Sequence, residues 1–398
     1  MPIEIIGMVA TRDASEIQGP LVDGPVADWT DGPVIDPGYL EAISRAHEAA
    51  NFDRVLVGYG SVAPEGWAIA ATVLSSTTRL KVLVAHRPGV VQPLVLARHA
   101  ATLDKLSGGG RVAIHFITGG DEADQHREGD FIFHDDRYRR TGETMEVVRR
   151  LMSDTKPFDF YGEFFRYEGA FISVKPNSPG EIPLYFGGAS APAIKVGAQF
   201  ADVYAFWGEP LEAIASRMST IEAAAEPLGR HLRYSVSFRP IIADTEEKAW
   251  AKAKLYTEIA TERIQRAKER LDANSPLSDG LGGHSHTTYS VRRDIHLTSS
   301  EGRKRLIEMA NLQDVFDERL WMRIANLTGA AGNSTALVGT SEQVAESLLR
   351  YYCLGVTALI LKGFDPIGDV VDYGGQLLPL IREGVRKIDE RNESTAID

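Results

Sequence analysis

Eight short segments rich in β-branched and other apolar residues recur along the chain, with amphipathic helical patterns between them. They cover residues 3–9, 54–58, 80–86, 112–118, 183–187, 202–207, 235–242 and 357–363. Near-continuous apolar strands that alternate with helices are typical of a parallel sheet covered on both faces. Eight such strands predict an α/β fold, a closed (β/α)8 TIM barrel.

The chain is longer than a bare barrel requires. It has 398 residues, whereas a barrel of this type needs about 250. The strand spacing predicts insertions after the fourth strand, at about residues 121–180, and after the seventh, at about 270–335. The first contains a helical pattern over 138–152 and a hairpin-like run over 158–167, and the second a polar stretch over 274–300 that suggests a lid or a disordered loop. We predict one domain over 1–390 and a disordered tail over 391–398.

Composition excludes several classes of partner. The net charge of -12 argues against binding a nucleic-acid backbone. A single cysteine, Cys353, excludes an internal disulfide, and its amphipathic surroundings predict a small core residue. No apolar run approaches the ~20 residues of a membrane-spanning helix, and the N-terminal residues lack the features of a signal peptide. We therefore expect a cytoplasmic protein with neither membrane nor nucleic-acid partners.

The sequence motifs do not indicate metal-dependent or nucleophilic catalysis. His284 and His286 lie in a glycine-rich loop, and the first strand ends without any metal-ligating residue type. We therefore predict no metal site. The chain also lacks a Gly-x-Ser-x-Gly elbow and a phosphate-binding Gly-x-x-x-x-Gly-Lys-Ser/Thr loop.

Two glycine-rich turns follow predicted strands, at the barrel end where active sites lie. Thr118 and Gly119 begin a Thr-Gly-Gly-Asp turn, in which the glycines would let a flat ring or a phosphate approach the backbone. The run 187–190, Gly-Gly-Ala-Ser, opens a helix and suits an anion, because free N–H groups and the helix dipole attract negative charge. An ordinary tight turn and a simple helix cap at Ser190 are the alternatives.

Other strand ends carry aromatic and basic residues. Trp207 follows the sixth strand, His86 and Arg87 the third, and Ser237 and Arg239 belong to the seventh. An indole at the barrel mouth could form the wall of a pocket for a flat cofactor or a substrate. A mouth with glycines, aromatics and cations, but no metal cluster, suits a cofactor that brings its own reactivity.

The order of these motifs resembles the bacterial-luciferase-like superfamily of flavin-dependent enzymes, and within it the two-component alkanesulfonate monooxygenases. The motifs that carry the resemblance are residues 87–93, 97–98, 100–111, 118–121, 133–138, 161–164, 183–190, 207–210 and 329–339. The resemblance spans roughly residues 3 to 385.

The resemblance implies a FMNH2-dependent monooxygenase. A separate NAD(P)H-dependent flavin reductase would supply the reduced FMN. With dioxygen, the enzyme would oxygenate the carbon that bears sulfur in a small anionic organosulfur substrate, and would release an aldehyde and sulfite. Homodimers or homotetramers are expected on the same ground.

Site residues follow from the same resemblance, position by position. Tyr138 and Ser190 would hold the FMN phosphate together with the backbone of Gly188 and Ala189. The full set of expected cofactor contacts is His86, Thr118, Gly119, Tyr138, Gly187, Gly188, Ala189 and Ser190. His86 and Thr118 would lie along the flavin ring, and a cis peptide is expected near Ala85–His86.

The substrate pocket departs from the family pattern. Ser237 and Arg239 stand where the family has an arginine and a histidine, and Arg12 replaces a histidine after the first strand. Phe364 and Pro366 replace a tyrosine and a histidine after the last strand. The predicted substrate contacts are Arg12, Trp207, Ser237, Arg239 and Phe364, with Arg239, His86 and Trp207 as catalytic residues. Candidate lid arginines are Arg292, Arg293, Arg303 and Arg305, for each of which solvated surface charge is the alternative.

Three other activities fit the same resemblance. A Baeyer–Villiger or sulfone monooxygenase would use the same cofactor on another substrate. A deazaflavin-dependent dehydrogenase would transfer a hydride without dioxygen. A non-catalytic flavin-binding protein would bind the cofactor at an open barrel mouth.

Overall fold

Eight parallel strands close into a barrel, as the sequence predicts. The computed structural model describes residues 3–11, 35–61, 63–119, 122–177, 182–273, 300–330 and 334–395. The barrel strands are β1 (Glu4–Met8), β2 (Arg54–Val57), β3 (Lys81–His86), β4 (Val112–Phe116), β7 (Leu184–Phe186), β8 (Val203–Trp207), β9 (Arg233–Ile242) and β13 (Val356–Leu361). They are hydrogen-bonded in this order, and β13 pairs with β1 to close the ring.

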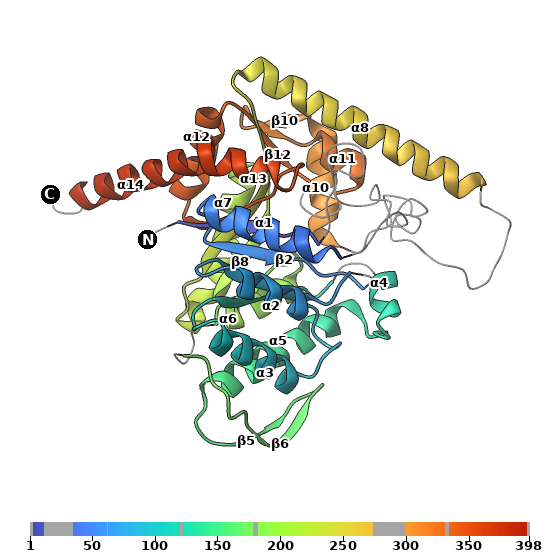
Figure 1. Cartoon of the computed structure of the whole chain (residues 1–398). Coiled ribbons are helices and arrows are strands. Elements are labelled where there is room, and N and C mark those ends of the chain that lie inside the picture. Colours follow the sequence, from blue (N-terminus) through green and yellow to red (C-terminus); the bar gives the residue numbers. More distant parts are fainter. Residues whose placement is uncertain are drawn as a thin grey trace.

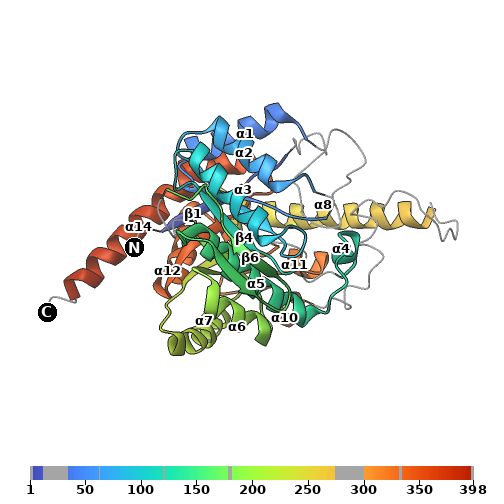
Figure 2. The same ribbon diagram turned by 90° about the horizontal axis from the view of Figure 1, so that it is seen from below.

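Helices surround the barrel, as the view in Figure 2 shows. They include α1 (Pro37–Ala49), α2 (Gly66–Ser76), α3 (Pro93–Leu106), α5 (His134–Ser153), α6 (Ala191–Phe200), α7 (Leu211–Ala225), α12 (Ser341–Cys353) and α14 (Leu378–Thr395). Local sequence fixes several of their starts. Asp36 caps α1 by accepting a hydrogen bond from the Tyr39 amide, and Thr340 and Gln343 form a capping box at α12.

Alternation along the strands separates two apolar layers. Residues that point into the barrel form one interior cluster: Ile6, Leu83, Ala113, Tyr185, Val203, Ala358 and Ile360, with Leu56 partly buried against it. Their strand neighbours, such as Val84, Ile114 and Phe116, belong to the larger cluster between the strands and the helices. Because the period of a strand is two, this alternation decides which face every mouth residue occupies.

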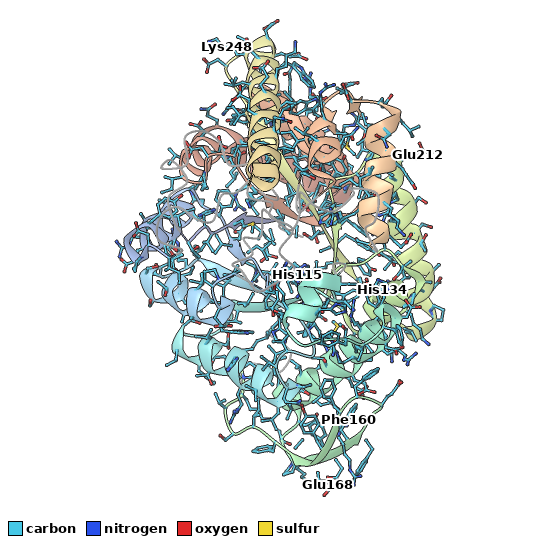
Figure 3. The ribbon with its side chains drawn as sticks, turned by 90° about the vertical axis from the view of Figure 1, so that its right-hand side faces the viewer. His115, His134, Phe160, Glu168, Glu212 and Lys248 are labelled. Carbon is cyan, nitrogen blue, oxygen red and sulfur yellow. The ribbon has the colours of Figure 1, made fainter. Side chains whose placement is uncertain are left out.

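The first insertion contains α4 (Glu122–Arg127), α5 and a hairpin of β5 (Phe158–Tyr161) and β6 (Arg166–Ala170). The two strands are antiparallel, which confirms the predicted hairpin. Figure 3 shows its residues Phe160 and Glu168 at one extremity of the molecule, well away from His115.

The second insertion builds a small extension on β9. It contains α8 (Glu246–Ala273), α10 (Glu301–Leu312), β10 (Val315–Phe316), β11 (Leu320–Trp321), α11 (Arg323–Thr328) and β12 (Ala336–Gly339). β12 pairs in parallel with the C-terminal part of β9, from Arg239 to Ile242. In Figure 1, α8 and α14 project from opposite sides of the barrel. Within the described ranges, no helix combines the length and the apolarity needed to cross a bilayer.

Two expectations require correction. α14 continues to Thr395, so residues 391–395 are helical where the sequence predicted a disordered tail. Side-chain ion pairs one turn apart, such as Arg386 with Glu390, support this helix end. Cys353 is exposed at the end of α12 rather than buried in the core, because the buried stripe of the helix ends at Tyr351.

Candidate active site at the barrel mouth

The loop between β7 and α6 forms a compact polar cradle. Ser190 caps α6 and accepts a hydrogen bond from the Ala193 amide at 3.4 Å. Tyr138, which α5 brings across the mouth, is hydrogen-bonded to Ser190 through its hydroxyl. Burial raises the pKa of Tyr138, so its hydroxyl stays protonated at neutral pH and can donate to an anion.

Glycine is required at this loop for steric reasons. A Cβ on Gly188 would lie 2.5 Å from the Ala193 Cβ and 3.4 Å from the Tyr138 hydroxyl. A Cβ on Gly187 would lie 3.0 Å from the carbonyl oxygen of Ala205. The structure therefore brings together the predicted group of Tyr138, Gly188 and Ser190, and leaves backbone accessible where a side chain would intrude.

Trp207 lies on the inward side of β8, at the mouth. The first turn of α10 covers it, because a methyl group at Gly302 would lie 3.6 Å from Trp207 Cζ3 and 3.9 Å from the Ala189 Cβ. The indole is thus positioned between the barrel interior and the second insertion. This placement fits the role of a pocket wall.

His86 occupies the other face of its strand. Leu83 points into the barrel, so alternation turns His86 toward the helices. Its ring lies 6.3 Å from Phe116 in the outer layer, and burial lowers the pKa of His86 to about 3. The contact of His86 with the flavin therefore stays a prediction, made from a ring that faces the outer layer. Within the described ranges, Ala85–His86 and every other peptide bond are trans, so the expected cis peptide was wrong.

The turn after β4 is covered by α4. Thr118 is buried and its hydroxyl lies 3.1 Å from that of Thr141. Gln125 donates to the Thr118 carbonyl oxygen at 2.8 Å, and a Cβ on Gly119 would lie 1.9 Å from the Gln125 Nε2. Gly119 adopts a positive φ of 83°, and the Gln125 side chain packs against it.

The predicted substrate residues of the last strands are deeply buried. Arg239 donates to the Gly363 carbonyl oxygen at 3.3 Å, and its guanidinium carbon lies 4.8 Å above the Phe364 ring. Burial lowers the pKa of Arg239 to about 10. Phe364 is fully buried against Tyr256 of α8, so it supports Arg239 instead of forming a pocket surface. Ser237 donates to the Phe206 carbonyl oxygen at 3.4 Å.

Two inward-facing residues were missed by the sequence analysis. Lys362 continues the alternation of Ala358 and Ile360, because its amide still donates to the Phe238 carbonyl oxygen at 3.1 Å. Burial lowers the pKa of Lys362 to about 7, and that of His115 on β4 to about 4. Counting alternate positions from Ala113 and Ala358 would have placed both side chains in the barrel.

A family model also matches most of the chain. The model of the luciferase-like monooxygenases matches residues 17–358. The chain belongs to this family. As a luciferase-like monooxygenase, it belongs to a family of oxidoreductases that act on small molecules.

Solved structures support the fold assignment. A riboflavin lyase, solved with modified FMN and riboflavin, is 20% identical, with a TM-score of 0.70 over 96% of this chain and 92% of that one. The EDTA monooxygenase of Chelativorans sp. BNC1 is 18% identical, with a TM-score of 0.69 and coverage of 96% and 94%. An F420-dependent secondary alcohol dehydrogenase is 16% identical, with a TM-score of 0.63 and coverage of 96% and 99%. Similar barrels therefore occur with a flavin and with a deazaflavin.

Several predicted residues of this luciferase-like monooxygenase lie outside the described ranges. They are Arg12, His284, His286, Arg292 and Arg293. Among the residues that the structure does describe, no group of three or more His, Cys, Asp or Glu side chains could hold a metal ion. Two candidate lid arginines make defined contacts, Arg303 with the Gly329 carbonyl oxygen and Arg305 with Glu209.

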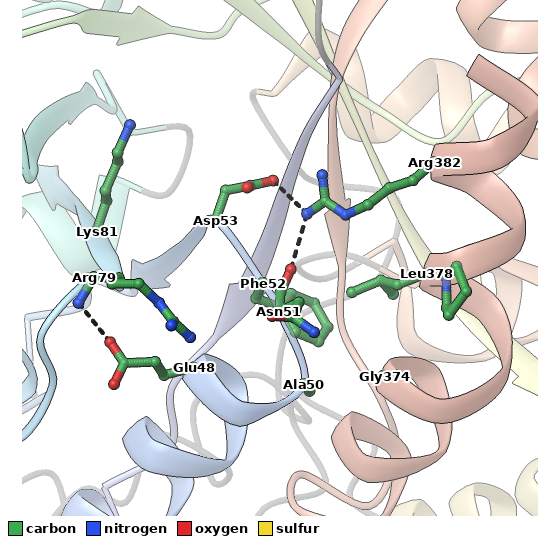
Figure 4. Close-up of a pocket in the computed structure, with 11 residues that line it drawn as sticks. Glu48, Ala50, Asn51, Phe52, Asp53, Arg79, Lys81, Gly374, Leu378 and Arg382 are labelled. Carbon is green, nitrogen blue, oxygen red and sulfur yellow. Dashed lines mark hydrogen bonds and ion pairs between the residues drawn. The ribbon is translucent and has the colours of Figure 1, made fainter. Parts of the chain in front are cut away.

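A hollow of about 620 Å³ lies at the opposite end of the barrel. Figure 4 shows it between the N-terminal ends of β2 and β3 and helix α14. Arg382 closes one side by donating to Asp53 and to the Asn51 carbonyl oxygen, and Glu48 accepts from the Arg79 amide. The hollow is therefore separate from the cradle of Tyr138 and Ser190.

Proposed function

We propose that this luciferase-like monooxygenase uses reduced FMN and dioxygen to oxygenate a small anionic organosulfur compound, with release of sulfite and an aldehyde. The observation that carries the proposal is the cradle of Tyr138, Gly188 and Ser190. Its two hydroxyls, its accessible backbone and the start of α6 suit a phosphate monoester. A phosphate at this point would leave a flat ring extending toward Trp207.

The chain's own residues would hold and orient the cofactor. Ser190, Tyr138 and the backbone of Gly188 and Ala189 would bind the phosphate. When bound, reduced FMN supplies the two electrons that activate dioxygen. As the family membership suggests, a separate NAD(P)H-dependent reductase would deliver the reduced cofactor.

The substrate side would combine an aromatic wall with cations. Trp207 and the first turn of α10 would exclude water from the reacting carbon, which limits wasteful reduction of dioxygen. Lys362 would attract the substrate anion in its protonated form; burial lowers its pKa to about 7, so part of the population is charged at neutral pH. Arg239, which is buried below the pocket surface, would attract the same anion over a longer distance.

The reaction is balanced for a sulfonate. The cofactor provides two electrons and two protons, and dioxygen provides two oxygen atoms. One oxygen atom becomes the aldehyde oxygen as the carbon–sulfur bond breaks, and the other leaves as water. The departing group is hydrogen sulfite.

A sulfite-release assay tests the proposal. Purified protein, a flavin reductase, NADH, FMN and air are combined with a panel of sulfonates and sulfones. Sulfite and aldehyde in equal amounts, dependent on dioxygen, would support the proposal. Oxygen-dependent products without sulfite would instead assign a Baeyer–Villiger or related substrate.

A deazaflavin-dependent dehydrogenase is the second candidate, favoured by the similarity to the F420-dependent alcohol dehydrogenase. The same cradle would then hold the phosphate of the deazaflavin. Anaerobic reduction of F420 by an alcohol, with no turnover of FMN under air, would establish this activity in place of the first.

A further inference from the structure

Glu209 forms a buried ionic bridge between two arginines from different parts of the chain. Its side chain is fully buried just after β8. Arg217 of α7 donates to it at 2.8 Å, and Arg305 of α10 donates through two nitrogens at 2.7 and 3.2 Å. We call Glu209, Arg217 and Arg305 the Glu209 bridge.

One end of the bridge holds the phosphate cradle. The second Nη of Arg217 donates to the Gly188 carbonyl oxygen at 3.0 Å, and the Tyr204 hydroxyl donates to the same oxygen at 3.1 Å. The Arg217 guanidinium also lies 4.5 Å from the Phe206 ring centre, which fixes its plane. Arg217 and Tyr204 together therefore hold the Gly188 backbone in place.

The other end of the bridge holds the first turn of α10, which lies over Trp207. Arg305 is one turn from Gly302, whose added methyl group would contact both Trp207 and Ala189. Arg303 fastens the same turn by donating to the Gly329 carbonyl oxygen at 2.8 Å. The first turn of α10 thus lies close to both Ala189 and the Trp207 indole.

We infer that Glu209 and Arg305 are positioning residues that couple the position of α10 to that of the phosphate cradle. Occupation of the cradle by a phosphate would then order α10 against Trp207. This inference rests on the proposed function, because it takes FMN as the phosphate-bearing ligand. It assigns to the second insertion a role in coupling cofactor binding to the shape of the substrate pocket.

The charges of the bridge explain the coupling. Two guanidinium groups share one buried carboxylate, so the bridge carries one excess positive charge beside the cradle. A phosphate dianion bound there compensates that charge and strengthens the hold on both arginines. Linkage requires the reverse as well, so an ordered α10 favours phosphate binding.

Hydrogen–deuterium exchange without any ligand tests the bridge itself. Glu209→Gln removes the carboxylate charge between two partly buried guanidinium groups, so we expect exchange about tenfold faster in residues 186–195 and 301–312. Arg305→Met should accelerate exchange in 301–312 only, because Arg217 keeps its contacts. The matched control is Lys304→Met on the same helix, whose exposed pair with Glu301 should not matter. Unchanged exchange of α10 in Arg305→Met would overturn the inference.

Addition of oxidised FMN or riboflavin tests the coupling. In the native protein, FMN should protect both segments, whereas riboflavin, which lacks the phosphate, should protect neither to the same degree. In Arg305→Met, FMN should still protect 186–195 but no longer 301–312. Protection of α10 by FMN in both proteins would overturn the inference. A lack of protection at 186–195 in the native protein would overturn the proposed cofactor, while the ligand-free comparison would still decide the bridge.

Discussion

The two ends of the barrel use their buried polar groups differently. At the N-terminal end, Arg54 donates to Glu4 at 2.9 Å and to the Val82 carbonyl oxygen at 2.8 Å, and the Tyr185 hydroxyl also donates to Glu4. Burial alone would raise the pKa of Glu4, but Arg54 and Tyr185 lower it overall. Glu4, Arg54 and Tyr185 therefore satisfy one another.

The mouth leaves hydrogen-bonding capacity unused. Among the described residues, the His115 Nδ1 and the Thr335 Oγ1, which lies beside Gly208 just after β8, have no hydrogen-bond partner, and both are shielded from solvent. Burial keeps His115 neutral by lowering its pKa to about 4. Buried polar groups without partners are costly, so a protein retains them mainly where a ligand or water completes them.

The contrast separates stability from function. Substitution of the paired polar groups at the N-terminal end should change the free energy of unfolding. Substitution of polar groups at the mouth should change ligand affinity or turnover. The hollow of Figure 4 belongs to the first kind, since ion pairs such as Arg382 with Asp53 line it. Arg54→Met, Trp207→Ala and Ser190→Ala test this division, and His115→Leu tests how a buried neutral side chain at the mouth makes stability depend on pH.

Arg54→Met should give the largest change. It leaves the Glu4 carboxylate buried without its cation, which typically costs about 3–5 kcal/mol of unfolding free energy. Urea denaturation measures the loss, and FMN affinity of the folded fraction should be unchanged. Arg45→Met, which removes an exposed pair with Glu41, is the control and should cost less than about 1 kcal/mol. A similar loss of unfolding free energy in both variants would contradict the claim that the buried pair of Arg54 and Glu4 stabilises the fold.

Acid should destabilise the protein through its buried histidines. In the folded state burial lowers the pKa of His115 from 6.5 to about 4, so between these values the unfolded chain binds more protons and stability falls as pH falls. His115→Leu should remove about 3 kcal/mol of this dependence between pH 6.5 and 4. The measurement is the unfolding free energy across that range. His126→Gln, at an exposed position on α4, should retain the native slope.

Trp207→Ala should separate the two functions of the mouth. Removal of the indole opens the substrate side, so we expect kcat/KM to fall about 10- to 100-fold while FMN affinity changes little. Steady-state kinetics and fluorescence titration with FMN measure the two effects. Trp250→Ala on α8 serves as the control for loss of an indole. Equal losses of FMN affinity and turnover would refute the assigned role of Trp207.

Ser190→Ala should have the smallest effect. It removes one hydroxyl from the cradle, so FMN affinity should fall about 3- to 10-fold and riboflavin affinity should not change. Because Ser190 also caps α6, Thr340→Ala at the cap of α12 is the matched control for lost helix stability. An unchanged FMN affinity in Ser190→Ala would remove this residue from the phosphate site.

Local sequence determined the eight strands, the hairpin and the cradle of this protein. Apolar runs of strand length identify buried parallel strands without any knowledge of distant contacts. Gly188 and Ser190 could be recognised because a helix start and a close backbone approach each demand particular residue types. The family resemblance then supplied Tyr138, which lies about fifty residues away.

Tertiary structure alone decided the faces and partners at the mouth. Position at a strand end suggested His86, but alternation within the closed barrel turned that ring outward and placed His115 and Lys362 inside. Gln125 covers Gly119, and Arg305 meets Glu209 from 96 residues away. Such contacts depend on how insertions fold back over the barrel, which no local pattern of residues encodes.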